Sequence, residues 1–132
     1  MKRFCQFFMM TMLLASSQRL LAEEKLYPVE TAVEIVGVVA EGKGYDANDR
    51  RENYFYLKLE RPISVAGDKI DRQRDGVAKI QMVFLADMDG RQYYRKRVVI
   101  KGKLFHGHTA HHHTGILVQI ESSADIRLLQ NR

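Results

Sequence analysis

The chain has 132 residues, a formal net charge of +5 and one cysteine, and 45% of its residues are hydrophobic. This length supports one small domain and excludes a chain of several domains. The single cysteine excludes an internal disulfide, so a hydrophobic core or a bound ligand must stabilise the fold.

The first 22 residues have the pattern of a secretory signal peptide. Lys2 and Arg3 precede an apolar run of about a dozen residues, which is too short to span a bilayer comfortably. We expect cleavage after Ala22, with Ser17 as an alternative position. A buried N-terminal helix is the competing interpretation, but Arg19 would interrupt its apolar face.

Cleavage would change the charge and the expected location of the protein. Three basic residues and the only cysteine, Cys5, leave with the leader, so 18 basic and 16 acidic residues remain and the net charge falls to +2. We therefore expect a periplasmic or secreted domain over residues 23–132. We expect no membrane span in it and no nucleic-acid partner.

The first half of this domain contains two predicted strands. Residues 31–42 are rich in β-branched side chains, and Gly37 within them suggests a bulge or the close approach of another backbone. Residues 43–53 are polar and predict a long loop. Residues 53–62 alternate between apolar and polar side chains and predict a half-buried strand ended by Pro62, with residues 63–65 as an edge continuation.

The second half contains three more predicted strands, over residues 77–86, 97–105 and 115–122. Gly102 marks a candidate bulge in the second of these. Residues 91–97 fit either a helical turn or an extended lead-in. The last nine residues fit a final strand or a short helix.

Five strands and no long helix predict an all-β fold. The lengths of the connections favour a small five-stranded OB-like Greek-key barrel. The connection between the third and fourth strands is short for the helix that such barrels often place there. An open antiparallel sheet or a sandwich is therefore the alternative.

Four strings of residues resemble a family of small exported bacterial proteins, the domain of unknown function DUF4431. They are ENYFYLKLERPISVAGD, IQMVF, VVIKGKLF and HTAHHHTGILV, and the resemblance extends over residues 31–122. Its most specific part is the His-His-His-Thr run, which the family usually precedes with Thr-Gly and this chain with Thr109-Ala110. The resemblance implies an exported β-barrel and supplies no reaction or catalytic residue.

All five histidines lie in FHGHTAHHHTG, residues 105–115. If Thr109-Ala110 formed a two-residue hairpin turn, four histidines would share one face within cross-strand distance: His106, His108, His111 and His113. Such a cluster suits zinc or copper. A wider loop would instead make a polar recognition surface, which histidine protonation could make pH-sensitive.

We expect the protein to act by binding a protein partner, and not as an enzyme. In this interpretation the chain itself is an inhibitor of that partner or an immunity protein against a toxin. OB-like barrels bind ligands beside two loops, which here are residues 42–53 and 106–114. The expected contact residues are Tyr45, Asp46, Asp49, Arg50, Tyr54, Tyr56 and His112.

Two acidic groups look like solvated loops. Asp46, Asn48 and Asp49 lack the glycine and the terminal glutamate of an EF-hand. The aspartates at 68, 71 and 75 lie among basic residues that neutralise them. No cofactor is required in this interpretation. The second hypothesis is a metal-binding protein that uses the histidine cluster.

Overall fold

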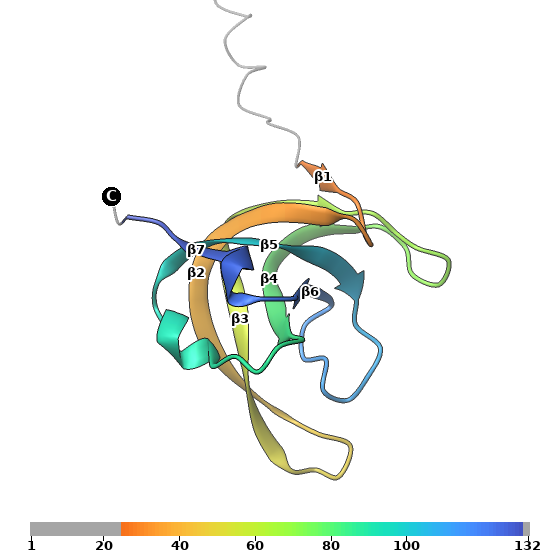
Figure 1. The fold of residues 1–132 in the computed structure, drawn as a ribbon. Helices are drawn as coiled ribbons and strands as arrows, with labels where there is room; N and C mark the ends of the chain where they lie inside the picture. Colours follow the sequence, from red (N-terminus) through yellow and green to blue (C-terminus); the bar gives the residue numbers. More distant parts are fainter. Residues whose placement is uncertain (1–24, 131–132) are drawn as a thin grey trace, which may run out of the picture.

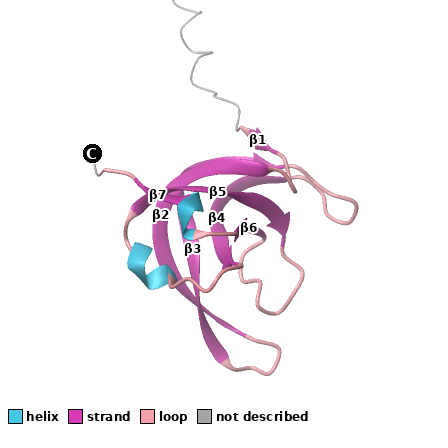
Figure 2. Ribbon diagram, in the orientation of Figure 1, coloured by secondary structure: helices cyan, strands magenta, loops and turns pink. Residues whose placement is uncertain are grey.

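A computed structural model describes residues 25–130, which form strands joined by short connections (Figure 1, Figure 2). The strands are β1 (Leu26–Tyr27), β2 (Ala32–Tyr45), β3 (Arg51–Val65), β4 (Arg74–Phe84), β5 (Arg97–His106), β6 (Ile116–Ile120) and β7 (Ile126–Leu128). Two short 3₁₀ helices, η2 (Gly90–Tyr93) and η3 (Ser123–Asp125), precede β5 and β7. The expected signal peptide and Cys5 lie outside the described residues.

Five strands pair in a closed ring, in the order β2-β3-β4-β6-β5 and back to β2. All pairs are antiparallel except β4 with β6, which is parallel. The all-β prediction is confirmed, and the ring closes as an OB-like arrangement requires. An open sheet is therefore not what these strands form. β1 adds to β3 and β7 adds to β5 at the outside of the ring.

The ring encloses the apolar faces that alternation predicts. Leu57, Ile80, Ile100 and Val118 are completely or almost completely buried in one cluster. Because successive side chains of a strand point to opposite faces, these residues fill the interior while their neighbours point outward. Among residues 25–130, no helix is long and apolar enough to cross a membrane.

β2 and β3 are longer than the sequence indicates. The prediction of a loop over residues 43–53 is wrong at both ends of that range, because the two strands stay paired out to Tyr45 and Arg51. The connection is only residues 46–50. Polar side chains can occupy this part of the ladder because this end of the hairpin extends beyond the core, as the lower part of Figure 1 shows.

Two glycines explain how closely the strands approach. The β2–β5 register is regular through both Gly37 and Gly102, so the expected bulge at Gly102 is not formed. A Cβ at Gly102 would lie 2.4 Å from the Gln119 carbonyl oxygen, and one at Gly37 would lie 2.5 Å from that of Lys58. Glycine is needed here for close approach.

The irregular pairing lies instead between β3 and β4. Their register shifts on both sides of Ile63, next to Pro62, which has no N–H to donate. The strand continues to Val65, so the prediction that Pro62 ends it is wrong. The predicted continuation over residues 63–65 forms, but it pairs with β1 on one side and β4 on the other and is therefore not an edge. The two ambiguous segments are also resolved: η2 occupies residues 90–93, and the last segment contains both η3 and the strand β7.

Candidate functional site

The histidine-rich loop, residues 107–115, folds back over the outer face of the β4–β6 pair. Gln81 and Leu117 are register partners on these strands, and both are buried although they point away from the core cluster. A Cβ at Gly107 would lie 3.2 Å from Leu117 Cδ1, so the loop backbone rests directly on this side chain. The loop is therefore a packed layer.

The side chain of Gln81 fixes the middle of the loop. Its amide nitrogen donates to the His111 carbonyl at 2.9 Å, and its amide oxygen accepts from the His113 N–H at 2.6 Å. The Gln81 backbone N–H donates to Thr114 Oγ1 at 2.9 Å, and that hydroxyl donates to the Ile116 carbonyl. These bonds satisfy buried polar groups that would otherwise be costly.

A second attachment joins the loop to β3. Glu52 Oε1 lies 2.5 Å from His113 Nε2, and Glu52 Oε2 lies 2.8 Å from His111 Nδ1. One carboxylate therefore bridges two imidazoles. Hydrogen bonds from His113 and then His111 hold the pKa of Glu52 below its ordinary value.

Aromatic rings extend this contact across β2 and β3. The Tyr54 ring stacks on the His113 imidazole with centroids 4.7 Å apart, and Tyr56 lies next to Tyr54 at 5.9 Å. A Cβ at Gly44 would lie 2.4 Å from the His113 ring, and one at Gly42 would lie equally close to the Tyr54 ring. The two glycines of β2 leave the space that these rings occupy.

The hairpin tip presents the other predicted contact residues. Tyr45 is 64% exposed, and Asp49 and Arg50 are also exposed. Asp46 has an internal role, since its Oδ1 accepts from the N–H groups of Asn48 and Arg50. Asp46 therefore shapes the turn, and Tyr45, Asp49 and Arg50 face solvent.

His112 is also used inside the loop. Its Nδ1 accepts from the backbone N–H groups of His108 and Thr109, at 2.9 and 3.2 Å, and its ring meets Phe105 edge-on. Burial, followed by repulsion from the neighbouring histidines, lowers the pKa of His112. The neutral imidazole thus closes a turn of the loop.

The four histidines considered as a metal cluster do not converge. Thr109-Ala110 is not a two-residue turn, because β5 ends by pairing His106 with Ile116 and the chain between them forms the wide loop. His106 is buried, with Nε2 2.9 Å from the Ala66 carbonyl oxygen, whereas His111 and His113 contact Glu52. The wider-loop alternative is the one that forms.

His108 points toward a different group, the turn between β3 and β4. Its Nε2 lies 3.1 Å from Asp71 Oδ2. Asp68, Asp71 and His108 each bring one potential ligand atom to within 4.8 Å of the others, the one such group of three among the described residues. The aspartates therefore do more than neutralise nearby basic side chains.

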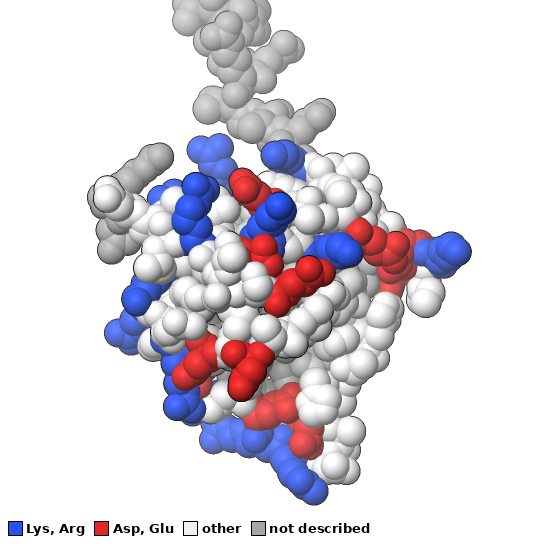
Figure 3. Space-filling view, viewed as in Figure 1, with Lys and Arg blue, Asp and Glu red and all other residues white. Residues whose placement is uncertain are grey.

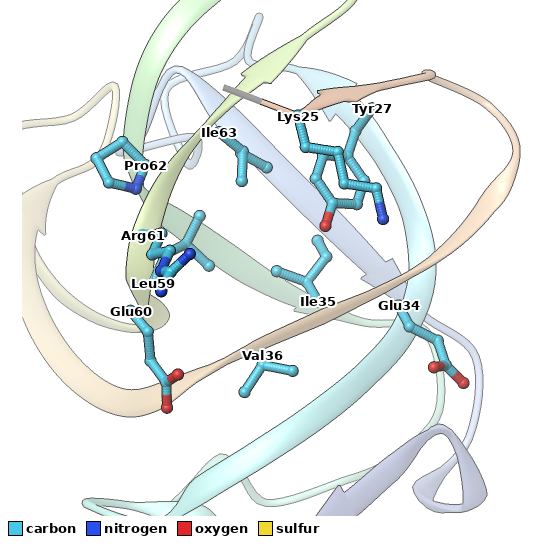
Figure 4. Close-up of a pocket in the computed structure, with 10 residues that line it drawn as sticks. All are labelled: Lys25, Tyr27, Glu34, Ile35, Val36, Leu59, Glu60, Arg61, Pro62 and Ile63. Atoms are coloured by element: carbon cyan, nitrogen blue, oxygen red, sulfur yellow. The ribbon is translucent and has the colours of Figure 1, made fainter. Parts of the chain in front are cut away.

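A separate groove opens where β2 and β3 diverge (Figure 4). The β2–β3 ladder begins at Gly37 and Leu59, and the groove lies before it, with a volume of about 630 Å³. Ile35, Leu59 and Ile63 line it with Tyr27. None of its lining residues belongs to the sites that the sequence predicts.

Acidic and basic side chains are interspersed over the face of the molecule that Figure 3 shows.

Comparison with known proteins identifies part of the chain. Residues 79–126 match the model of DUF4431, a domain of unknown function. The predicted resemblance to this family is confirmed over this segment, whereas residues 31–78 of the predicted extent lie outside the match. The DUF4431 segment runs from β4 to the start of β7 and includes Gln81 and the whole histidine-rich loop. No curated protein and no solved structure matches the chain significantly.

Sequence reasoning missed three residues that organise the site: Glu52, Gln81 and Asp71. Each contacts a histidine-loop residue at least 30 positions away. Glu52 and Gln81 occupy outward positions of alternating strands, where polar side chains are expected. Their burial or pairing depends on the course of the loop, which local periodicity does not encode.

Proposed function

We propose that this protein is an exported binding module that recognises a protein partner through one composite surface. The surface comprises the hairpin tip (residues 45–50), the outer side chains of β3 at Tyr54 and Tyr56, and the histidine-rich loop. The observation on which the proposal rests is the joining of these segments. Glu52 and Tyr54 bind the loop to the hairpin, so the two predicted ligand loops form one continuous face.

The side chains of this surface suit protein recognition. Tyrosine and arginine are enriched among the residues that dominate binding energy, and Tyr45 and Arg50 lie exposed at the tip. Tyr54 and Tyr56 add aromatic area that the loop and Lys79 hold in place, with the Lys79 ammonium 5.3 Å from the Tyr56 ring centroid. A preorganised surface loses less entropy on binding.

We further propose that the protein acts as an inhibitor or immunity protein and not as an enzyme. Within residues 25–130, the histidine rings contact carboxylates, backbone groups and aromatic rings. Contacts of this kind suit the ordering of a surface for binding, and this supports the proposal. A small exported domain with a stiff surface fits the blocking of another protein.

Photocrosslinking tests the recognition surface. The purified protein carrying benzoylphenylalanine in place of Tyr45 is irradiated in an envelope extract of the host, alongside a control with the probe at Leu128 on β7. We expect one discrete adduct from position 45 that excess unlabelled protein suppresses and excess Arg50→Glu protein does not. An adduct that forms equally from position 128, or that both competitors suppress equally, would contradict the proposed surface.

Export is tested separately by the mass of the protein recovered from its host. Removal of residues 1–22 predicts a chain that begins at Glu23 and appears in the periplasmic or extracellular fraction. A full-length chain recovered from the cytoplasmic fraction would contradict export while leaving the binding surface open to the crosslinking test.

A further inference from the structure

We propose that Asp68, Asp71 and His108 bind one zinc ion between the β3–β4 turn and the histidine-rich loop. The proposal goes beyond the partner-binding surface. It shares His108 of the histidine-rich loop with that surface and takes its two carboxylates from the β3–β4 turn. It also differs from the four-histidine cluster that the sequence suggested, because only one of those histidines takes part.

One carboxylate oxygen at this site, Asp71 Oδ2, lacks a hydrogen-bond donor. Asp71 Oδ2 is buried and has no hydrogen-bond partner among the described residues. His108 Nε2 is 3.1 Å away, close enough for an ion pair, but it is not aligned as a hydrogen-bond donor. The Asp71 side chain is 34% exposed, but its Oδ2 is enclosed without a hydrogen-bond donor, and a cation at this position would compensate the charge of that oxygen.

The potential ligands come from two segments distant in sequence. Two carboxylates and one imidazole offer ligand atoms that all lie within 4.8 Å of one another. Zinc binds both donor types at about 2.0–2.2 Å, so donors around one tetrahedral ion lie about 3.3–3.6 Å apart. Small side-chain rotations would complete the site, with water as the fourth ligand. Calcium is disfavoured because it takes six to eight oxygen ligands.

Backbone hydrogen bonds already hold these potential ligands in place. Asp68 Oδ1 accepts from the N–H groups of Ile70 and Asp71 at 2.8 and 2.7 Å, and the Asp68 N–H donates to the Asp71 carbonyl. The His108 N–H donates to His112 Nδ1. His106 contacts Ala66 just before the turn. Zinc would add a third attachment for the loop, beside Gln81 and Glu52.

Titration calorimetry with zinc chloride tests the site in protein purified without a histidine tag. We expect one saturable ion per chain and a higher melting temperature with zinc. Asp71→Asn and His108→Ala should each weaken binding at least about tenfold. The matched controls, Asp75→Asn and His111→Ala, should bind zinc as the wild type does.

Melting of the metal-free variants checks that each one folds. In the wild type, zinc should also shift the His108 imidazole resonances more than those of His111. The proposal is overturned if the wild type shows no saturable binding. It is also overturned if folded Asp71→Asn and His108→Ala bind zinc unchanged, or if His111→Ala loses binding as they do.

Discussion

Glu52 Oε1 and His113 Nε2 lie 2.5 Å apart, although 61 positions separate the two residues. This contact joins the long β2–β3 hairpin to the loop that follows β5. His113 is almost enclosed, with 10% of its side chain exposed, whereas His111 on the same carboxylate is 69% exposed. We therefore expect His113 to contribute most of the attachment, because exposed ion pairs contribute little.

The Glu52 bridge predicts a specific acid dependence of stability. The folded protein lowers the pKa of Glu52 below 4.5, so the folded state binds fewer protons than the unfolded chain. Its contribution is complete above about pH 4.5 and is lost as the pH falls through the lower, folded value. Glu52→Gln should be less stable than the wild type at neutral pH, and the difference should shrink on acidification.

Urea unfolding at a series of pH values measures this difference. Asp87→Asn, at an exposed position, serves as the control and should track the wild type. A constant gap between Glu52→Gln and the wild type down to pH 2 would show that the carboxylate charge is not responsible.

Gln81 should be essential for the packing of the histidine-rich loop. Gln81→Leu leaves the His113 N–H and the His111 carbonyl without their partner, which costs about 1–3 kcal/mol of unfolding free energy. Amide hydrogen exchange should show the loss of protection at His113. Gln92→Ala, at an exposed position, should unfold like the wild type. Unchanged protection of the His113 amide in Gln81→Leu would contradict this role of Gln81.

Gly44 should be required for the Tyr54–His113 stack. In Gly44→Ala the new methyl group would enter the space of the imidazole, 2.4 Å from His113 Nδ1. We expect the His113 ring protons to lose the ring-current shift that Tyr54 imposes, as measured by NMR. Lys43→Ala changes the neighbouring exposed residue and should leave this shift in place. If the His113 ring protons kept this shift in Gly44→Ala, the Tyr54–His113 stack would not depend on the space that Gly44 leaves.

The interior of the ring should dominate stability. Leu57 is fully buried, so Leu57→Ala should lower the unfolding free energy by about 2–5 kcal/mol. Leu85 is 58% exposed, and Leu85→Ala should change it by less than about 0.5 kcal/mol. Equal losses in the two variants, measured by urea unfolding, would mean that Leu57 does not lie in a packed core.

The sequence by itself determined the five strands of the ring and the side of each strand that faces the core, although not the full length of β2 and β3. Leu57, Ile80 and Val118 stand at alternating positions, and a strand with one buried face can satisfy that alternation in only one register. The family resemblance also followed from local strings of residues, and the match over residues 79–126 bears out three of the four, namely IQMVF, VVIKGKLF and HTAHHHTGILV.

Only the tertiary structure decided what the polar residues do. Gln81 and Glu52 occupy outward positions that periodicity predicts as solvated, and the loop that covers or pairs with them lies between β5 and β6, 30 or more positions away in the sequence. The contacts of the histidines also depend on the tertiary structure. Their spacing permits a four-membered cluster, but the wide turn separates them and brings His108 to Asp71 instead. Local patterns fix strand faces because neighbouring residues share one backbone geometry, whereas a loop takes its path from distant partners.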